Sequence, residues 1–283
     1  MVFQDKEHAQ KINELFVAVK IVKNKGNYKE LRELYHMRGF PTVIVLAPDG
    51  SERDRIVGFA NNPDKYMQKL TDYAHNRNTL SMLQKKYRQD SMDVEITFKL
   101  AEKYMDRFEA KNAQPYFRRV IKLTDDPGDK YAQQACYQIA TYQARNHQND
   151  APLLELIPQL DREKKSDAYV TLARSHNAQA DTQKTFYYYE KALKELPRDA
   201  GLMNAYAWTV FEYKYHKKYD RAIQVAEKAV KLDPDNSSIW DTLGWLYYAN
   251  GDTTEAIRAM QQAFDLDPDN EYYRDNLQTF KKQ

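Results

Sequence analysis

The chain has 283 residues, of which 42% are hydrophobic, with 43 lysines and arginines against 41 aspartates and glutamates and a single cysteine. This length allows one or two domains, and no apolar run is long enough to predict a membrane-spanning helix, so the composition is that of a soluble protein. The balanced charge argues against nucleic acid as a partner, because binding to phosphates needs an excess of basic residues. The single thiol, Cys136, excludes an intramolecular disulfide and a cysteine-rich metal site.

The first 77 residues combine helical and strand patterns. In chain order we expect a helix over 5–14, a strand buried on both faces over 15–22, a helix over 27–37, a hairpin of strands over 42–47 and 55–59, and a helix from about residue 63. This order of helix, strand, helix, strand, strand and helix predicts an α/β layer. No signal peptide is recognised at the start, which is charged and helix-like.

A short motif inside this part carries a family resemblance. Gly39-Phe40-Pro41-Thr42, followed by the hairpin turn at Asp49-Gly50, resembles the later two thirds of a thioredoxin fold. In that family this segment contains a cis-proline that shapes a peptide-binding groove, which implies a binding role for Phe40 and Pro41. Alternatively, the proline serves the fold alone by orienting the next strand.

Two parts of the thioredoxin pattern are missing. Enzymes of that family exchange disulfides through a Cys-x-x-Cys motif, which this chain lacks. The first strand is missing as well, and in the family it lies between the counterparts of 15–22 and 42–47. The sequence starts at Met1-Val2-Phe3, where related chains have reached the far end of the active-site helix. We therefore expect that the start of this domain is missing from the sequence.

Residues 78–93 are predicted to form a linking helix with Leu80, Leu83 and Tyr87 on one face. The link contains no spacer rich in proline, glycine or serine. We therefore expect the domains on its two sides, 1–77 and 94–283, to dock against each other.

One spacing recurs from Val94 onward and is clearest in residues 237–270. Trp240, Leu243, Gly244 and Tyr247 form a stripe on a first helix, and Ala256, Met260 and Ala263 form a stripe on a second. The turn Asn250-Gly251-Asp252 separates the two helices. The pattern closely resembles a tetratricopeptide repeat, in which Gly244 would face Ala256 where the two helices approach each other.

The same spacing starts again at Val94, Ser166 and Met203. The weakest unit is 131–165, where Pro152 and Pro158 are expected to interrupt or shift the second helix. A polar-faced helix over 271–282 resembles a capping helix. Residues 94–283 are thus predicted to form an α-solenoid of about five tetratricopeptide repeats with this cap, giving an overall class of α/β plus all-α.

The repeat resemblance implies a concave face, lined by the first helices, that holds an extended peptide or a partner helix. In this register the groove candidates are Arg174, Trp208, Phe211, Lys214, Asp241, Trp245 and Tyr248. The alternative for Trp208 and Trp245 is that they pack between neighbouring helices. The carboxylate clamp of some chaperone-binding relatives is not expected, because its lysine and asparagine sites are Phe98 and Glu102 here.

Other chemistry is sparse in the sequence. The six histidines have no spacing that would place metal ligands on one helix face, so we predict no metal and no cofactor. His176 replaces the tyrosine usual at its repeat position, which favours a half-buried structural ring over a catalyst. No phosphate-binding loop or nucleophile elbow is present, and no catalytic residue is predicted.

These features favour an interaction module that combines a redox-inactive thioredoxin-like domain with a peptide-binding or protein-binding repeat array. Its expected partner is a protein or peptide, without nucleic acid, membrane insertion or a small-molecule cofactor. The rival hypothesis is a fragment of a periplasmic thiol-disulfide oxidoreductase whose catalytic N-terminus is missing, and a third is a structural adaptor whose groove is unused. The periplasm is expected if a signal peptide precedes Met1, and the cytoplasm otherwise.

Overall fold

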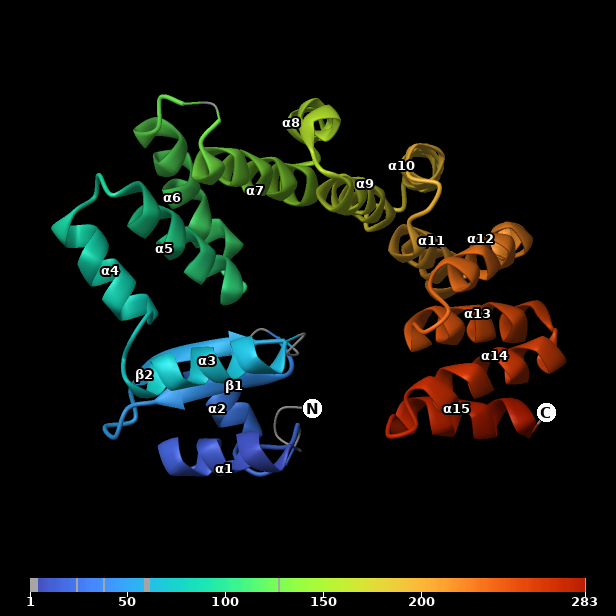
Figure 1. Cartoon of the computed structure of the whole chain (residues 1–283), viewed down its shortest axis with the longest axis horizontal. Helices are drawn as coiled ribbons and strands as arrows, with labels where there is room; N and C mark the ends of the chain where they lie inside the picture. Colours follow the sequence, from blue (N-terminus) through green and yellow to red (C-terminus); the bar gives the residue numbers. More distant parts are fainter. Residues whose placement is uncertain (1–4, 24, 38, 59–61, 127, 283) are drawn as a thin grey trace. The chain divides into compact units, whose positions relative to one another are not determined.

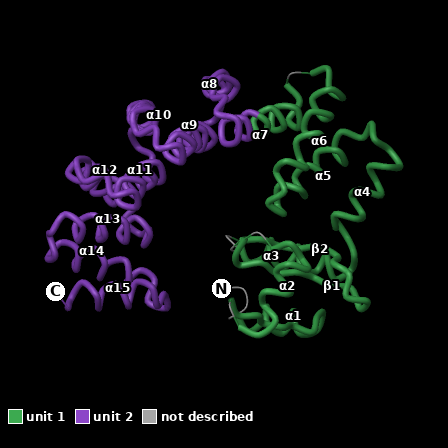
Figure 2. Tube along the Cα trace, turned by 180° about the vertical axis from the view of Figure 1, so that it is seen from behind, with its two compact units in different colours: residues 1–139 green, residues 140–283 purple. Residues whose placement is uncertain are grey.

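The computed structural model describes residues 5–23, 25–37, 39–58, 62–126 and 128–282. Most of these residues are helical, and the chain divides into two compact units, residues 1–139 and residues 140–283 (Figures 1 and 2). None of the described helices combines the length and the apolar character needed to cross a membrane.

The first unit begins with short helices around one hairpin (Figure 1). The elements are α1 (Lys6–Leu15), α2 (Tyr28–Leu34), β1 (Thr42–Leu46), β2 (Glu52–Val57) and α3 (Pro63–Ala74). The predicted hairpin is confirmed: β1 and β2 are antiparallel, with Thr42 opposite Val57. The second strand ends before Phe59, which lies outside the described residues. The peptide bond between Phe40 and Pro41 is cis.

The buried strand predicted over 15–22 is wrong. Leu15 ends α1, and the following residues form no strand among the described residues. Val17 is 95% exposed and Val19 is 76% exposed. An apolar run becomes a buried strand only where neighbouring strands satisfy its backbone groups, and the described sheet consists of β1 and β2 alone. The expected α/β layer is therefore reduced to a two-stranded hairpin flanked by helices.

A small core joins this hairpin to the helices beside it. Ile12 from α1, Val45 from β1, and Met67, Leu70 and Tyr73 from α3 are buried together. Both helices begin at a capping side chain that accepts a backbone N–H, Asp5 for α1 and Asn62 for α3. The apolar stripes of these helices are therefore placed against the hairpin.

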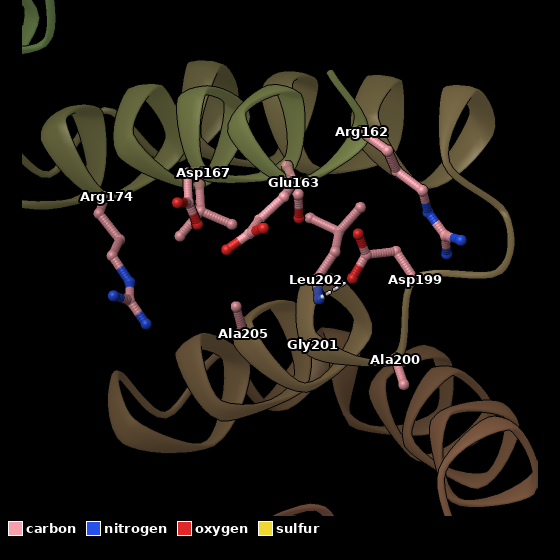
Figure 3. A pocket seen from close by; sticks show the side chains of 11 residues that line it. Arg162, Glu163, Asp167, Arg174, Asp199, Ala200, Gly201, Leu202 and Ala205 are labelled. Carbon is pink, nitrogen blue, oxygen red and sulfur yellow. Dashed lines mark hydrogen bonds between the residues drawn. The ribbon is translucent and has the colours of Figure 1, made fainter. Parts of the chain in front are cut away.

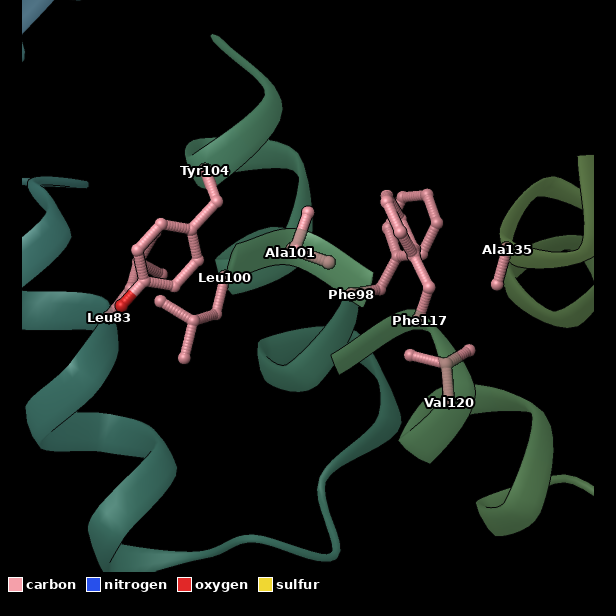
Figure 4. Close-up of a cluster of buried hydrophobic side chains, with 9 residues drawn as sticks. Leu83, Phe98, Leu100, Ala101, Tyr104, Phe117, Val120 and Ala135 are labelled. Atoms are coloured by element: carbon pink, nitrogen blue, oxygen red, sulfur yellow. The ribbon is translucent and has the colours of Figure 1, made fainter. Parts of the chain in front are cut away.

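Three further helices complete most of the first unit: α4 (Leu80–Gln89), α5 (Val94–Asp106) and α6 (Ala110–Leu123). The linking helix predicted over 78–93 corresponds to α4. Figure 4 shows the core between these helices, which is built from Leu83 of α4, Phe98, Leu100, Ala101 and Tyr104 of α5, Ala113, Phe117 and Val120 of α6, and Ala135. The first predicted repeat is thus a pair of helices, α5 and α6, packed through large apolar side chains.

A buried carboxylate connects the hairpin to these helices. Asp54 on β2 is fully buried, and it accepts hydrogen bonds from the backbone N–H of Leu80, at 3.0 Å, and of Arg55, at 2.8 Å. Its oxygens also lie 3.1 Å from Lys103 Nζ and 2.9 Å from Arg107 Nη1. Burial lowers the pKa of Lys103, and the negative charge of Asp54 opposes that shift. Within this unit the hairpin and the first repeat are held together by ionic contacts.

Further helices follow, and most of them pack in consecutive pairs. They are α7 (Lys130–His147), which spans the boundary between the units, α8 (Ala151–Leu156), α9 (Arg162–Asn177), α10 (Thr182–Glu195), α11 (Ala200–Glu212), α12 (Tyr219–Leu232), α13 (Ser237–Asn250), α14 (Thr253–Leu266) and the final α15 (Glu271–Lys281). Short 3₁₀ turns at Ile157–Gln159 and His216–Lys218 lie between them. The expected effect of Pro152 and Pro158 is confirmed, because α8 has only six residues and passes into a 3₁₀ turn at Pro158.

The predicted close approach of α13 and α14 is also confirmed. A Cβ atom at Gly244 would lie 3.3 Å from the backbone nitrogen of Met260 and 3.4 Å from the carbonyl oxygen of Ala256. Gly251 ends α13 with a φ of 90°, a left-handed conformation that favours glycine. The repeat spacing therefore identified both the tight contact and the turn that permits it.

Candidate functional site

A pocket of about 550 Å³ lies between α9 and α11 in the second unit (Figure 3). Six of its lining residues are on α9: Arg162, Glu163, Ser166, Asp167, Val170 and Arg174. The opposite side is formed by Asp199 and by the start of α11 at Ala200, Gly201, Leu202 and Ala205. The pocket is therefore framed by the first helices of two successive helix pairs.

Charged groups dominate this pocket. Glu163 and Asp167 lie one turn apart on α9, and Asp199 caps α11 by accepting the backbone N–H of Leu202 at 2.8 Å. In Figure 3 the three carboxylates lie between Arg174 at one end and Arg162 at the other. Partial burial raises the pKa of Asp167, and the carboxylate of Glu163 raises it further. The middle of the pocket is thus an acidic environment.

Ser166 places a hydroxyl group at the same pocket. Ser166 is 8% exposed and lines the pocket. In the sequence of α9 it lies between Glu163 and Asp167. Within the described part of the chain the Oγ atom has no hydrogen-bond partner. The Oγ atom is not among the side-chain atoms that are fully buried without a partner, so it is open to the pocket and has hydrogen-bonding capacity for a bound group.

An aromatic cluster lies further along the same unit. Phe211 on α11 stacks on Trp245 of α13 with ring centroids 5.3 Å apart, and Trp208 lies 5.3 Å from Phe211. Trp245 also meets the edge of Phe280 on α15 at 4.9 Å, while Tyr248 stacks on Phe280 at 4.3 Å. The rings connect three helices, α11, α13 and α15, and Phe280 is fully buried beneath them.

Asp241 lies on α13 one turn before Trp245. The side chain is 8% exposed, and its Oδ1 atom is buried without a hydrogen-bond partner in the described structure. Burial raises the pKa of Asp241 to about 7. Burial raises the pKa of the nearby Tyr272, and the negative charge of Asp241 raises it further.

This buried carboxylate predicts a pH dependence of stability. The pKa of Asp241 is higher in the folded chain than in the unfolded chain, so a charged Asp241 destabilises the fold. This loss of stability is absent below about pH 4, where Asp241 is protonated in both states, and it grows as the pH rises to about 7. We expect Asp241→Asn to raise the free energy of unfolding by about 1 kcal/mol or more at pH 8, since one pKa unit corresponds to about 1.4 kcal/mol. Urea unfolding at pH 8 and pH 4 measures the difference. An equal effect at both pH values would contradict the prediction.

The structure separates the predicted site residues into groups. Arg174 lines the pocket, whereas Trp208, Phe211, Trp245 and Tyr248 form the aromatic cluster, Asp241 is buried beside it, and Lys214 is exposed after the end of α11. Trp245 contacts rings from α11 and α15, so it packs between neighbouring helices while remaining half-buried. The binding roles of all these residues stay predictions.

Phe40 and Pro41 lie in the first unit, away from this set in the sequence. Phe40 is 52% exposed, and its ring centroid lies 6.0 Å from that of Tyr28. Lys23 Nζ lies 5.8 Å from the same ring. The exposure of Phe40 leaves its ring accessible for contact, and its binding role stays a prediction.

Glu163, Ser166 and Asp167 were not predicted as site residues. A repeat counted from Ser166 omits the first turn of α9, which begins at Arg162 and contains Glu163. Asp167 precedes Arg174 by seven residues, so both lie on one face of α9. The spacing that selected Arg174 therefore also contained the signal for Asp167.

The described residues contain no group of three histidine, cysteine, aspartate or glutamate side chains placed to hold a metal ion. His176 is 3% exposed, and its Nε2 atom lies 2.7 Å from Oδ2 of Asp150. The same carboxylate oxygen accepts the hydroxyl group of Tyr188 at 2.7 Å. His176 therefore belongs to a buried structural contact between helices, more buried than the half-buried ring that the sequence predicted.

Comparisons with known proteins agree with the helix pairs. Residues 215–279 match the model of the tetratricopeptide repeat family. A yeast protein from Saccharomyces cerevisiae, small glutamine-rich tetratricopeptide repeat-containing protein 2, is 32% identical over 117 residues, which is 40% of this chain and 33% of the yeast protein. The chain therefore spans about a third of the length of this curated relative.

Solved structures of repeat proteins are also similar. One of them is YrrB, described as a TPR protein with an unusual peptide-binding site. It superposes with a TM-score of 0.42 at 14% identity, and the match covers 69% of this chain and 96% of the YrrB chain. A thermophilic TPR protein from Thermus thermophilus has a TM-score of 0.44 at 21% identity and covers 67% of this chain and 100% of its own. The family match covers residues 215–279, which include α12, α13 and α14, so this part of the chain is similar to tetratricopeptide repeats.

Proposed function

We propose that the chain is a protein-interaction module whose second unit binds an extended peptide segment in the pocket between α9 and α11. The observation that carries this proposal is the open pocket of about 550 Å³ between the first helices of two successive repeats. Stacked helical repeats commonly bind extended segments along the surface formed by such helices. The proposed ligand is therefore a peptide or an unfolded segment of a partner protein.

The lining of the pocket suits a peptide. The half-buried Val170 provides apolar contact area, and the carboxylates and arginines around it provide hydrogen-bonding groups for the peptide backbone and side chains. The aromatic cluster around Trp245 lies on the following first helices, α13 and α15. We propose that it extends the binding surface, with Trp208, Phe211 and Tyr248 contributing contact area.

Filling the pocket tests this function. Ala205 lines the pocket and is half-buried, so Ala205→Trp would occupy the space with an indole ring. A peptide is first selected on the immobilised full chain from a library of random 12-residue peptides, and its Kd is then measured by fluorescence anisotropy. We expect Ala205→Trp to weaken binding about tenfold or more, since losing a buried contact of 1.4 kcal/mol has that effect.

The matched control is Ala249→Trp, at an exposed position on α13 that does not line the pocket. It should leave the Kd unchanged. Two results would contradict the function: a library that yields no binding peptide, or a selected peptide that binds Ala205→Trp as tightly as the unmodified chain.

We also propose, as a separate matter, that residues 1–77 form a redox-inactive thioredoxin-like domain, with 78–93 as the link and 94–283 as the repeat array. The observations that support it are the antiparallel hairpin of β1 and β2 and the flanking helix α3. In this proposal Phe40 and Pro41 contact a bound peptide. The oxidoreductase alternative would need thiols that residues 1–77 do not contain.

A further inference from the structure

We propose that Glu163, Ser166 and Asp167 form a subsite that binds a lysine side chain of the peptide. This inference rests on the proposed function, because it names the ligand chemistry of the same pocket. Its three residues are on α9 and all line the pocket. An arginine side chain is expected to bind there more weakly than lysine.

The first observation is an unusual arrangement of charge. Elsewhere in the chain a glutamate is followed four residues later by a lysine that pairs with it, as in Glu7 with Lys11 and Glu95 with Lys99. On α9 the residue four positions after Glu163 is Asp167, a second acid. Like charges at this spacing destabilise a helix, whereas opposite charges stabilise it. A bound cation between the two carboxylates would reverse that effect.

The second observation is that both carboxylates are available. Neither Glu163 nor Asp167 takes part in an ion pair or a side-chain hydrogen bond within the described residues. The nearby Arg162 is directed elsewhere, since its Nη2 atom donates to the backbone carbonyl of Arg198. Arg174 lies at the opposite end of the pocket from Arg162 in Figure 3. The middle of the pocket is therefore acidic, and the positive charges of Arg145 and Arg174 offset that of Asp167 only in part, since the pKa of Asp167 is still raised.

The third observation is the hydroxyl group of Ser166. The residue is more than nine-tenths buried, lines the pocket, and has no hydrogen-bond partner among the described residues. A lysine ammonium group has three donors and no acceptor. The two carboxylates and the Ser166 Oγ atom provide three acceptors on one helix face. A planar guanidinium suits a bidentate contact with one carboxylate, so the arrangement favours lysine.

The test uses end-capped ten-residue peptides labelled with a fluorophore. The central residue is fixed as lysine, arginine, glutamine or glutamate, and the other positions are mixtures of uncharged residues. We expect the lysine pool to bind about tenfold more tightly than the glutamine pool, since a charge-assisted hydrogen bond contributes on the order of 1.4 kcal/mol or more. The arginine pool should rank second, and the glutamate pool should bind most weakly.

Two variants identify the residues responsible. The double variant Glu163→Gln with Asp167→Asn should bind the lysine and glutamine pools equally, within about twofold, because the amides preserve shape and remove charge. The control variant Asp220→Asn removes an exposed carboxylate of α12 that does not line the pocket, and it should keep the tenfold preference. Circular dichroism checks that both variants keep their helical content.

Each remaining outcome has a distinct meaning. If all pools bind equally well, the lysine subsite is wrong while the peptide-binding function stands. If the lysine preference survives in the double variant, the subsite is likewise wrong. If no pool binds, the proposed function fails and the subsite fails with it.

Discussion

Replacing Asp54 with alanine should cost about 3–5 kcal/mol in the free energy of unfolding of the first unit, the range found when one partner of a buried ion pair is removed. The reason is that Lys103 would keep its charge in a buried environment without the carboxylate that pairs with it, and Arg107 would lose one of its carboxylate partners. The side chain of Lys103 is 9% exposed, and that of Arg107 is 10% exposed.

The loss would extend beyond the two ion pairs. Asp54 also accepts the backbone N–H of Leu80, at the first residue of α4, and that donor would remain unsatisfied in the variant. Glu52 would still pair with Arg107, because Arg107 Nη1 lies 2.8 Å from its Oε1 atom. Lys103 would retain its hydrogen bond to the hydroxyl group of Tyr73 and its position over the Tyr73 ring, 4.5 Å from the centroid. The hairpin, α4 and α5 should therefore loosen together.

The measurement is urea unfolding, combined with amide hydrogen exchange in α4 and α5 as a local report. Asp106→Ala is the matched control, because Asp106 forms a half-exposed pair with Lys69 in the same unit, at 2.7 Å. An exposed pair contributes about 0–1 kcal/mol, so this control should change little. Equal losses in the two variants would show that the buried network does not stabilise the unit.

The same network could not be predicted from the sequence. Asp54 is one of several charged residues in an otherwise polar strand, and the sequence indicates an outward-facing position for such a residue. Its burial depends on Lys103 of α5 and on Arg107, which directly follows α5, and both are about fifty residues away. Local patterns contain no information on which distant charges will pair.

Sequence patterns worked best where the structure depends on neighbours in the chain. The hairpin, the close approach at Gly244 and the shortened helix α8 all follow from local sequence patterns. The strand expected over 15–22 failed because a strand needs partners that its own sequence does not supply. The pocket was found only in part, since the helix face was recognised through Arg174 but the start of α9 was misplaced.

Replacing Gly244 with leucine should cost about 2 kcal/mol or more in the second unit, because overpacking of a close helix contact has an effect of that size. The Cβ atom alone would lie 3.3 Å from the backbone nitrogen of Met260, and backbone atoms of α14 cannot move aside as a flexible side chain can. The further atoms of leucine would have to separate α13 from α14. Glycine is intrinsically unfavourable in a helix by roughly 1 kcal/mol, so this gain partly offsets the clash.

Ala249→Leu serves as the control for this prediction, because Ala249 is an exposed residue of the same helix. Leucine and alanine have similar helix propensities, and an exposed leucine meets no neighbouring backbone, so the control should unfold within about 0.5 kcal/mol of the unmodified chain. Gly244→Ala should fall between the two, since it adds only the Cβ atom at 3.3 Å. Urea unfolding followed by circular dichroism at 222 nm orders the three variants. If Gly244→Leu unfolds at the same urea concentration as Ala249→Leu, then α13 and α14 do not approach at Gly244, and the repeat spacing that predicted this contact places it at the wrong residue.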